Sequence, residues 1–262
     1  MRIVVLTKPV PDPAAAAERL GADNRLDRAA SPAVINGNDE YVLEAALKLV
    51  EAHGGEVVLL TMAPATGPET MRKGLAMGAH RGVHVTDAAL EGSDAWSTAR
   101  VLAAALGEME YDLVLAGFDT SDGTAGVVGA GIAALLKLPY LSSAARIEPD
   151  TDAGTVRVRR ISATGFDVLE APMPALIVGT QLLGEPRYPS LKGIMGARSK
   201  EIVTRTLGDL GLAAEEVGTA GSRTKVARKR TPPPRGEARV VRGSAREAAK
   251  EIVGLLTERR LI

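Results

Sequence analysis

The first half of the chain alternates two kinds of hydrophobic pattern. Short runs are continuously apolar and rich in β-branched residues, as in strands buried on both faces, and longer stretches carry apolar residues at helical spacing. The short runs lie at 2–7, 56–62, 82–86 and 112–117, and the helical stretches lie at 38–55, 67–79, 94–109 and 126–138. Strands that alternate with helices of this length form a parallel sheet with helices on both faces. We therefore predict an α/β domain with a Rossmann-like parallel sheet.

The pattern changes after Pro139. Residues 140–180 contain several β-rich runs, separated by the hairpin signals PDTDAG and ATG. These features predict antiparallel strands that extend the sheet at one edge. Residues 1–184 are thus expected to form one domain.

A segment with an unusual surface follows at 185–201, with the sequence EPRYPSLKGIMGARSKE. It places Leu191 at the tip of a proline-rich turn, then Ile194 and Met195, and it closes with Arg198 and Lys200. An apolar tip with basic flanks on a loop is typical of a surface that touches a partner. The alternative is that Ile194 and Met195 are buried and only Leu191 is exposed.

The last part of the chain, 202–262, reads as an arm and a helix. The stretch from Arg223 to Arg242, here called the basic arm, has too many like charges and prolines to fold by itself. Its basic residues are Arg223, Lys225, Arg228, Lys229, Arg230, Arg235, Arg239 and Arg242, against the single acid Glu237. Beyond it, Ser244 and Glu247 have the spacing of a capping box. An apolar stripe of Ile252, Val253, Leu255 and Leu256 then predicts an amphipathic helix that buries one face on this domain or on a partner.

Composition narrows the classes of function. The chain has 32 basic and 32 acidic residues and no cysteine, which argues against nucleic-acid steering, disulfides and thiolate metal sites. The apolar run at the N-terminus is too short for a signal peptide, so a cytoplasmic protein is expected. We find no Ser-His-Asp arrangement and no nucleophile elbow in the sequence.

Candidate binding residues lie where the strands of the parallel sheet end, because ligands bind there. The first strand ends at Leu6, Thr7 and Lys8, and the second at Thr61 and Met62. A third strand runs into AGFDTSDGTAGVVGAG at 116–131, here called the glycine turn. Its glycines before a helix can hold a phosphate, or they can simply form a flexible turn with tight helix packing. A carboxylate in such a turn, Asp122, is either a base or a turn cap.

Several motifs together carry a family resemblance. Segment 185–201 resembles a run found in the β subunit of electron transfer flavoprotein, and KPVPD, ETMRKGLAMGAHRGVHV, the glycine turn and LPY agree with it along the chain. The resemblance implies an adenine-nucleotide hydrolase-like version of the Rossmann-like fold. It also implies a heterodimer whose α subunit holds most of the FAD, while this chain binds AMP or a second FAD. The chain would be an electron carrier subunit and not a catalyst on its own.

The same resemblance assigns roles to segments. In the family, segment 185–201 is a recognition loop that anchors in acyl-CoA dehydrogenases of fatty acid β-oxidation, and Leu191 occupies the anchor position. Ile194 and Met195 would line the contact, Arg198 and Lys200 would steer acidic partners, and residues 202–262 would pack on the α subunit.

The resemblance also points to nucleotide-binding residues, by matching positions. Asn36, Leu6 and Met62 match family positions that contact AMP. The glycine turn contributes Gly117, Asp122, Gly123, Thr124, Ala125, Gly126, Val127, Val128 and Gly129. Gly126, Val127 and Val128 replace polar residues of the AMP pattern, so backbone amides would hold the phosphate. Ala163 and Thr164 replace acidic residues common in the family's hairpin, which weakens an inferred contact with the partner's flavin domain.

A hypothesis from another class stays open beside the electron carrier. The chain could be a stand-alone adenine-nucleotide-binding module, or a hydrolase in which Asp122 or Thr124 acts on a phosphate.

Overall fold

The computed structural model describes residues 1–15, 20–230, 232–234, 236 and 240–262. Within these, the chain forms two units, 1–226 and 227–262, which are described separately. Three charged residues of the basic arm, Arg235, Glu237 and Arg239, lie outside the described residues, as do Thr231 and Ala238.

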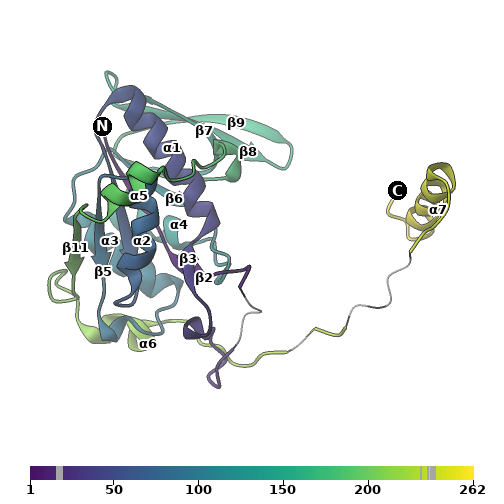
Figure 1. The fold of residues 1–262 in the computed structure, drawn as a ribbon, viewed down its shortest axis with the longest axis horizontal. Coiled ribbons are helices and arrows are strands. Elements are labelled where there is room, and N and C mark those ends of the chain that lie inside the picture. Colours follow the sequence, from purple (N-terminus) through teal and green to yellow (C-terminus); the bar gives the residue numbers. More distant parts are fainter. Residues whose placement is uncertain (16–19, 231, 235, 237–239) are drawn as a thin grey trace. The chain divides into compact units, whose positions relative to one another are not determined.

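The first unit is built on a twisted sheet (Figure 1). Among the described residues it has nine strands in the order β11-β5-β4-β1-β6-β10-β7-β8-β9. Neighbours from β11 to β7 pair in parallel, and β8 and β9 continue the sheet antiparallel. The strands are β1 (Arg2–Leu6), β4 (Glu56–Met62), β5 (Arg81–Val85), β6 (Leu113–Gly117), β7 (Tyr140–Asp150), β8 (Thr155–Ser162), β9 (Gly165–Pro172), β10 (Ala175–Gly179) and β11 (Ile202–Arg205), with a separate ribbon of β2 (Pro9–Pro11) and β3 (Ala33–Ile35).

Helices cover both faces of the parallel part. The described helices are α1 (Gly37–His53), α2 (Gly67–Met77), α3 (Ala95–Gly107), α4 (Val128–Leu136), α5 (Leu191–Ala197), α6 (Gly218–Gly221) and α7 (Ala245–Glu258), with 3₁₀ turns η1 (Arg28–Ala30), η2 (Ala88–Leu90), η3 (Gln181–Leu183) and η4 (Ala214–Glu216). Because successive strand residues point to opposite faces, Ile3 and Val5 join the core under α1 and α2, whereas Val4 and Leu6 join the core under α3 and α4. This double burial explains the continuous apolar runs of the sequence.

The structure confirms the predicted α/β class and its antiparallel edge. The turn at 151–154 joins β7 to β8, and Ala163 and Thr164 join β8 to β9, as the hairpin signals predicted. Two details differ. The run at 140–180 also contains β10, which returns to the centre and pairs in parallel with β6 and β7. The predicted helix at 126–138 begins only at Val128, because the glycine turn keeps an irregular backbone before it.

The second unit contains α7. Ser244 Oγ accepts a hydrogen bond from the amide of Glu247 at 3.4 Å, and the Glu247 carboxylate accepts one from the amide of Ser244 at 2.9 Å, so the predicted capping box is confirmed. Of the apolar stripe of α7, Ile252 and Val253 are exposed, whereas Leu255 and Leu256 are half-buried. No helix in the described part of the chain is both long and apolar enough to cross a membrane.

Candidate functional site

The carboxyl ends of β1, β4 and β6 meet in the middle of the sheet, because β1 pairs with both neighbours. The predicted residues Thr7 and Thr61 lie there and are almost fully buried. Their hydroxyl oxygens are 2.6 Å apart, and Thr61 Oγ1 also lies 2.6 Å from the carbonyl oxygen of Thr7, to which it donates. Both side chains thus tie β1 to β4, and the backbone of Thr7 is engaged as well, because its amide donates to the carbonyl of Leu60 at 2.9 Å.

Asn36, predicted from the resemblance, is buried at the start of α1. Its Nδ2 donates to Asp39 Oδ1 at 2.9 Å and to the carbonyl of Asp119 at 2.8 Å, which engages both amide hydrogens. Its Oδ1 accepts from the amide of Ser121 at 3.2 Å. Asn36 therefore holds the beginning of the glycine turn against α1.

Asp39 is a member of this edge that the sequence did not reveal. Its Oδ2 accepts the backbone N–H of Lys8 at 2.8 Å, and its side chain is enclosed. A Cβ on Gly117 would lie 2.5 Å from Asp39 Oδ1, so β6 can end here only with glycine. Burial raises the pKa of Asp39 to about 7, although the hydrogen bonds from Asn36 and Lys8 oppose the rise. The only available signal was its place in the first helical turn, where an acid is ordinarily a cap.

Asp122 lies between two cations. Its Oδ1 is 2.8 Å from Lys8 Nζ, and its Oδ2 forms an ion pair with the guanidinium of Arg28 on η1. The Arg28 contact does not align an N–H with Oδ2, which has no hydrogen bond within the described residues. Burial opposes ionisation, but the hydrogen bond from Lys8 and the two positive charges outweigh it and lower the pKa of Asp122 to about 2. Arg28 carried no motif, so the sequence could not have pointed to it.

The rest of the glycine turn exposes its backbone. Thr124 and Gly126 have positive φ angles of 43° and 61°, an alternation that turns successive amides toward one side. In the described part of the chain, the amides of Gly123, Ala125, Gly126 and Val127 donate to no protein acceptor. The N-terminus of α4 follows directly, and it adds positive potential.

Tight helix packing, the other interpretation of these glycines, also applies to part of the turn. A Cβ on Gly129 would meet Val178 Cγ2 at 2.8 Å, so Gly129 lets α4 lie close to β10. Gly129 is buried and Val128 half-buried, whereas the predicted residues from Gly123 to Val127 are exposed. The exposed residues form the open side of the turn.

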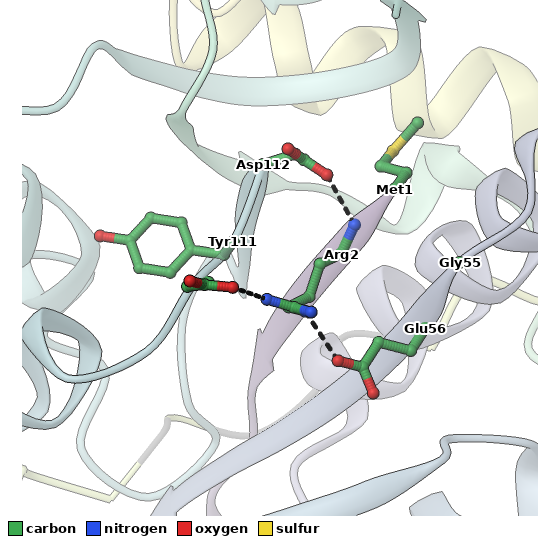
Figure 2. Close-up of a pocket in the computed structure, with 7 residues that line it drawn as sticks. Met1, Arg2, Gly55, Glu56, Tyr111 and Asp112 are labelled. Carbon is green, nitrogen blue, oxygen red and sulfur yellow. Dashed lines mark hydrogen bonds and ion pairs between the residues drawn. The ribbon is translucent and has the colours of Figure 1, made fainter.

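A cavity of about 420 Å³ lies at the opposite edge of the sheet, lined by the amino ends of β1, β4 and β6 (Figure 2). Arg2 spans it: Nε is 2.8 Å from Glu56, Nη1 is 2.5 Å from Glu110, and the backbone amide is 2.6 Å from Asp112. Because these charges satisfy one another, and ligands of parallel sheets bind at the carboxyl edge, we place the candidate site at the glycine turn.

Segment 185–201 is partly helical rather than a loop throughout. Ser190 caps α5, accepting from the amide of Gly193 at 3.0 Å, and Leu191 is the first helical residue. Leu191, Ile194 and Met195 are 75%, 49% and 67% exposed, so the alternative that only Leu191 is exposed is wrong. Tyr188, which we had not singled out, is 96% exposed beside them.

Both ends of segment 185–201 are anchored to the domain. At its start, Arg187 Nε is 2.7 Å from Glu44 Oε2, Nη2 is 3.1 Å from Glu44 Oε1, and Nη2 is also 3.0 Å from Glu51 Oε2. Burial opposes the charge of Glu44, which is 3% exposed, but the bonds from Arg187 hold its pKa below the usual range. The segment therefore begins on a bidentate ion pair with α1.

The other end is anchored by carbonyl contacts. Arg72 donates to the carbonyl oxygens of Ala197 and Lys200, at 2.5 and 2.7 Å. Lys200 Nζ donates to the carbonyls of Leu75 and Ala79 near the end of α2, at 2.9 and 2.6 Å, and burial lowers its pKa. Lys200 is thus a structural cation and not the free steering charge that we expected. Arg198 is exposed and remains available for that role.

The basic arm begins at a helix cap. Asp94 caps α3 with Oδ1, 2.8 Å from the amide of Ser97, while its Oδ2 accepts the amides of Arg223 and Thr224, both at 2.9 Å. The guanidinium of Arg223 lies 5.6 Å from the centre of the Trp96 ring. The root of the arm is therefore held by the first unit.

Comparison with known proteins now bears on this geometry. The model of the electron transfer flavoprotein domain matches residues 23–210, which include the glycine turn and segment 185–201. The chain is 40% identical over 230 residues to the electron transfer flavoprotein subunit beta of Mycobacterium leprae, covering 86% of each protein. The chain belongs to the electron transfer flavoprotein β-subunit family. The Mycobacterium tuberculosis subunit beta is 37% identical over 266 residues, with 99% of each protein covered.

Family members also occur inside larger complexes. The chain is 34% identical over 268 residues to the caffeyl-CoA reductase-Etf complex subunit CarD of Acetobacterium woodii, covering the whole of both proteins. The family membership supports a role as one subunit of an electron-transferring flavoprotein.

Proposed function

We propose that the chain is the β subunit of a heterodimeric electron transfer flavoprotein that docks dehydrogenases through segment 185–201. Electrons pass from the dehydrogenase to an FAD held mainly by the α subunit, and from there to a downstream acceptor. The observation that carries the proposal is the exposed apolar side of α5, fixed at both ends on a chain of this family. The chain itself is a carrier subunit and not a catalyst.

The docking role follows from how segment 185–201 is held. A surface whose backbone is already ordered loses little conformational entropy on binding. Leu191 is the most exposed apolar side chain of α5, which suits an anchor for a pocket on an acyl-CoA dehydrogenase-type partner. Ile194 and Met195 extend the contact, and Arg198 steers an acidic rim towards it. A small anchor lets the carrier leave after each transfer.

We further propose that the carboxyl edge holds an adenine nucleotide, either AMP or a second FAD. The site fits a phosphate on three grounds: the open amides of Gly123, Ala125, Gly126 and Val127, the N-terminus of α4, and the two cations that pair with Asp122. Backbone of Leu6 and Met62 would line the base or ribose. Asn36 would act mainly by holding the turn, since its amide hydrogens are engaged. If the bound nucleotide is AMP, it makes this edge of the sheet more rigid. If it is FAD, it supplies a second redox centre.

The hydrolase alternative has less support from the geometry. A general base should hold a pKa near the working pH, whereas Asp122 has a pKa of about 2 and is paired with two cations. Thr124 is exposed, and no described residue beside it acts as a base toward its hydroxyl.

Co-expression with the α subunit tests the carrier role. The complex should be yellow, and its flavin should be reduced by acyl-CoA dehydrogenases in stopped-flow experiments. Leu191→Ala should lower transfer about thirtyfold at subsaturating donor, corresponding to roughly 2 kcal/mol of lost docking. Leu135→Ala, an equally conservative change at an exposed position on α4, is the matched control and should leave transfer unchanged.

Salt dependence tests the steering. Arg198→Gln should lower the association rate at low salt and flatten its decline as salt rises. Transfer rates that do not respond to Leu191→Ala, in a complex that keeps its flavin, would exclude segment 185–201 as the docking surface.

A further inference from the structure

Three charged side chains from distant parts of the chain meet at the glycine turn. Lys8 follows β1, Arg28 lies on η1, and Asp122 lies in the turn itself. The Asp122 side chain is fully shielded, whereas those of Lys8 and Arg28 are 37% and 45% exposed. Each cation therefore contacts a buried carboxylate and is also open to solvent. A cation must be open to solvent in this way if it is to bind a second anion.

Two further carboxyl groups, those of Asp39 and Asp119, belong to this edge of the sheet. Lys8 and Arg28 pair with Asp122, which is ionised at neutral pH. Lys8 also lies near the enclosed Asp39, whose pKa is about 7 and which is therefore only partly ionised there. Asp119 contributes its carbonyl to Asn36 and Asn38, while its carboxylate accepts the amide of Thr120. The attraction of the two cations for a further anion therefore comes from their solvent-exposed ends, and not from an excess of positive charge at this edge.

Asp122 is also an imperfect partner for these cations. Its Oδ2 is shielded from water but receives no aligned hydrogen bond within the described part of the chain. A shielded carboxylate oxygen that has an ion pair but no aligned N–H has lost hydration that the protein replaces only in part. A phosphate offers more charge and more acceptor oxygens in the same position.

The cations adjoin the open amides of the turn. A Cβ placed on Gly123 would lie 3.6 Å from Lys8 Nζ, so the ammonium group is next to the backbone that begins the amide row. A ligand phosphate held by the open amides of the turn, which begin at Gly123, would therefore lie within reach of Lys8. Arg28 approaches the same carboxylate from the η1 side.

We propose that Lys8 and Arg28 form a two-cation clamp that Asp122 occupies in the free protein, and that the phosphate of an adenine nucleotide displaces Asp122 from it. The inference rests on the proposed nucleotide role and deepens it: Arg28 contacts the ligand, and Asp122 competes with the ligand. The internal carboxylate keeps the cations ordered and sets how easily the nucleotide exchanges.

The two substitutions have opposite expected signs. Full-length protein in complex with its α subunit is stripped of nucleotide and titrated with AMP by calorimetry. Arg28→Gln should raise the dissociation constant for AMP about tenfold, because a charge-assisted contact is lost. Asp122→Asn should lower it several-fold, because the competitor loses its charge while its shape is kept. Binding of adenosine, which has no phosphate, should be unchanged by Arg28→Gln.

The control is Arg25→Gln. Arg25 lies on the same part of the chain but contacts Thr219 and Asp23 rather than Asp122, so its loss should leave AMP affinity as it was. If Asp122→Asn unfolds the complex, Asp122→Ala removes the carboxylate and its buried oxygens together and should also tighten AMP binding.

Two outcomes overturn the inference in distinguishable ways. If Asp122→Asn weakens AMP binding or leaves it unchanged, or if Arg28→Gln has no effect, the ion pairs are structural and the clamp is wrong, although the nucleotide role stands. If the unmodified complex binds no AMP and releases no adenine nucleotide on denaturation, the nucleotide role fails and takes the clamp with it.

Discussion

The glycine turn and segment 185–201 differ in which side chains they bury: the turn buries polar side chains, whereas the segment exposes apolar ones. At the turn, Asn36 and Asp39 are buried and satisfy each other and the backbone. On α5, the apolar side chains of Leu191 and Met195 are exposed to solvent. A buried polar network is costly unless every member is bonded, and an exposed apolar patch is costly unless a partner covers it.

The two surfaces are therefore ordered for binding in two different ways. At the turn, polar groups inside the protein fix a backbone whose amides stay open to a ligand. In segment 185–201, ion pairs and carbonyl contacts at the two ends fix a short helix whose apolar side chains stay open to a partner. The glycine turn is thus held by the polar side chains buried beneath it, and segment 185–201 is held by the contacts at its two ends. Substitutions can test each half of this comparison.

The largest effect is expected from Gly117→Ala. The new methyl group would lie 2.5 Å from Asp39 Oδ1 and 2.8 Å from the carbonyl carbon of Asn38, so α1 or β6 must shift. We expect the free energy of unfolding to fall by about 3 kcal/mol in chemical denaturation. Gly37→Ala, where a Cβ meets nothing within 4 Å, is the control and should change stability little. If Gly117→Ala lowers the free energy of unfolding no more than Gly37→Ala does, the polar network beneath the turn adjusts to the added methyl group at little cost.

Arg187→Gln should have the next largest effect, because it leaves the buried carboxylate of Glu44 without its bidentate partner. Lys48 lies 3.4 Å from Glu44 and compensates in part, so we expect a loss of roughly 2 kcal/mol in denaturant unfolding. Arg157→Gln breaks an exposed pair with Glu170 and should cost less than about 0.5 kcal/mol. If Arg187→Gln also lowers the free energy of unfolding by less than about 0.5 kcal/mol, segment 185–201 is not anchored at its start.

The pH dependence of stability probes Asp39. Its pKa rises on folding from 3.8 to about 7, so between these values the folded state holds a proton that the unfolded chain has lost. Stability from this group is therefore full at low pH and falls as pH rises through about 7. We expect the unmodified protein to lose on the order of 2 kcal/mol more than Asp39→Asn between pH 5 and 8.

The measurement is a series of denaturant titrations across that pH range. Asp152→Asn, at an exposed hairpin turn, should retain the slope of the unmodified protein. Parallel slopes for the unmodified protein and Asp39→Asn would mean that Asp39 is ionised in the folded state throughout.

The smallest effects on stability should come from the docking side chains. Leu191→Ala and Met195→Ala remove exposed groups and should change the free energy of unfolding by less than about 0.5 kcal/mol. Leu75→Ala, at a fully buried position on α2, should cost about 3 kcal/mol and sets the scale. A loss above about 1 kcal/mol for Leu191→Ala would indicate that the residue packs in the protein.

Local pattern was enough to predict most elements of the sheet. The strand at 56–62 was predicted with the bounds that β4 has, because both faces of that strand are buried and its apolar run is unbroken. The irregular glycine turn shifted the start of α4 to Val128, because the run GVVGAG continues the helical pattern before the helix itself begins. The helical part of segment 185–201 was missed, because its proline-rich entry reads as a turn while Ser190 caps a helix.

The sequence by itself determined the α/β class, the family and several residues of the carboxyl edge, though not Asp39 or Arg28, because hydrophobic period and short motifs are properties of neighbouring positions. Only the tertiary structure decided that β10 returns between β6 and β7, that Arg28 meets Asp122, and that Lys200 is bound to carbonyls. These facts join residues far apart in the chain, and the charge of a side chain does not say which partner the fold will bring to it. Burial and pairing, which set the pKa values of Asp39 and Asp122 apart, exist only once the chain has folded.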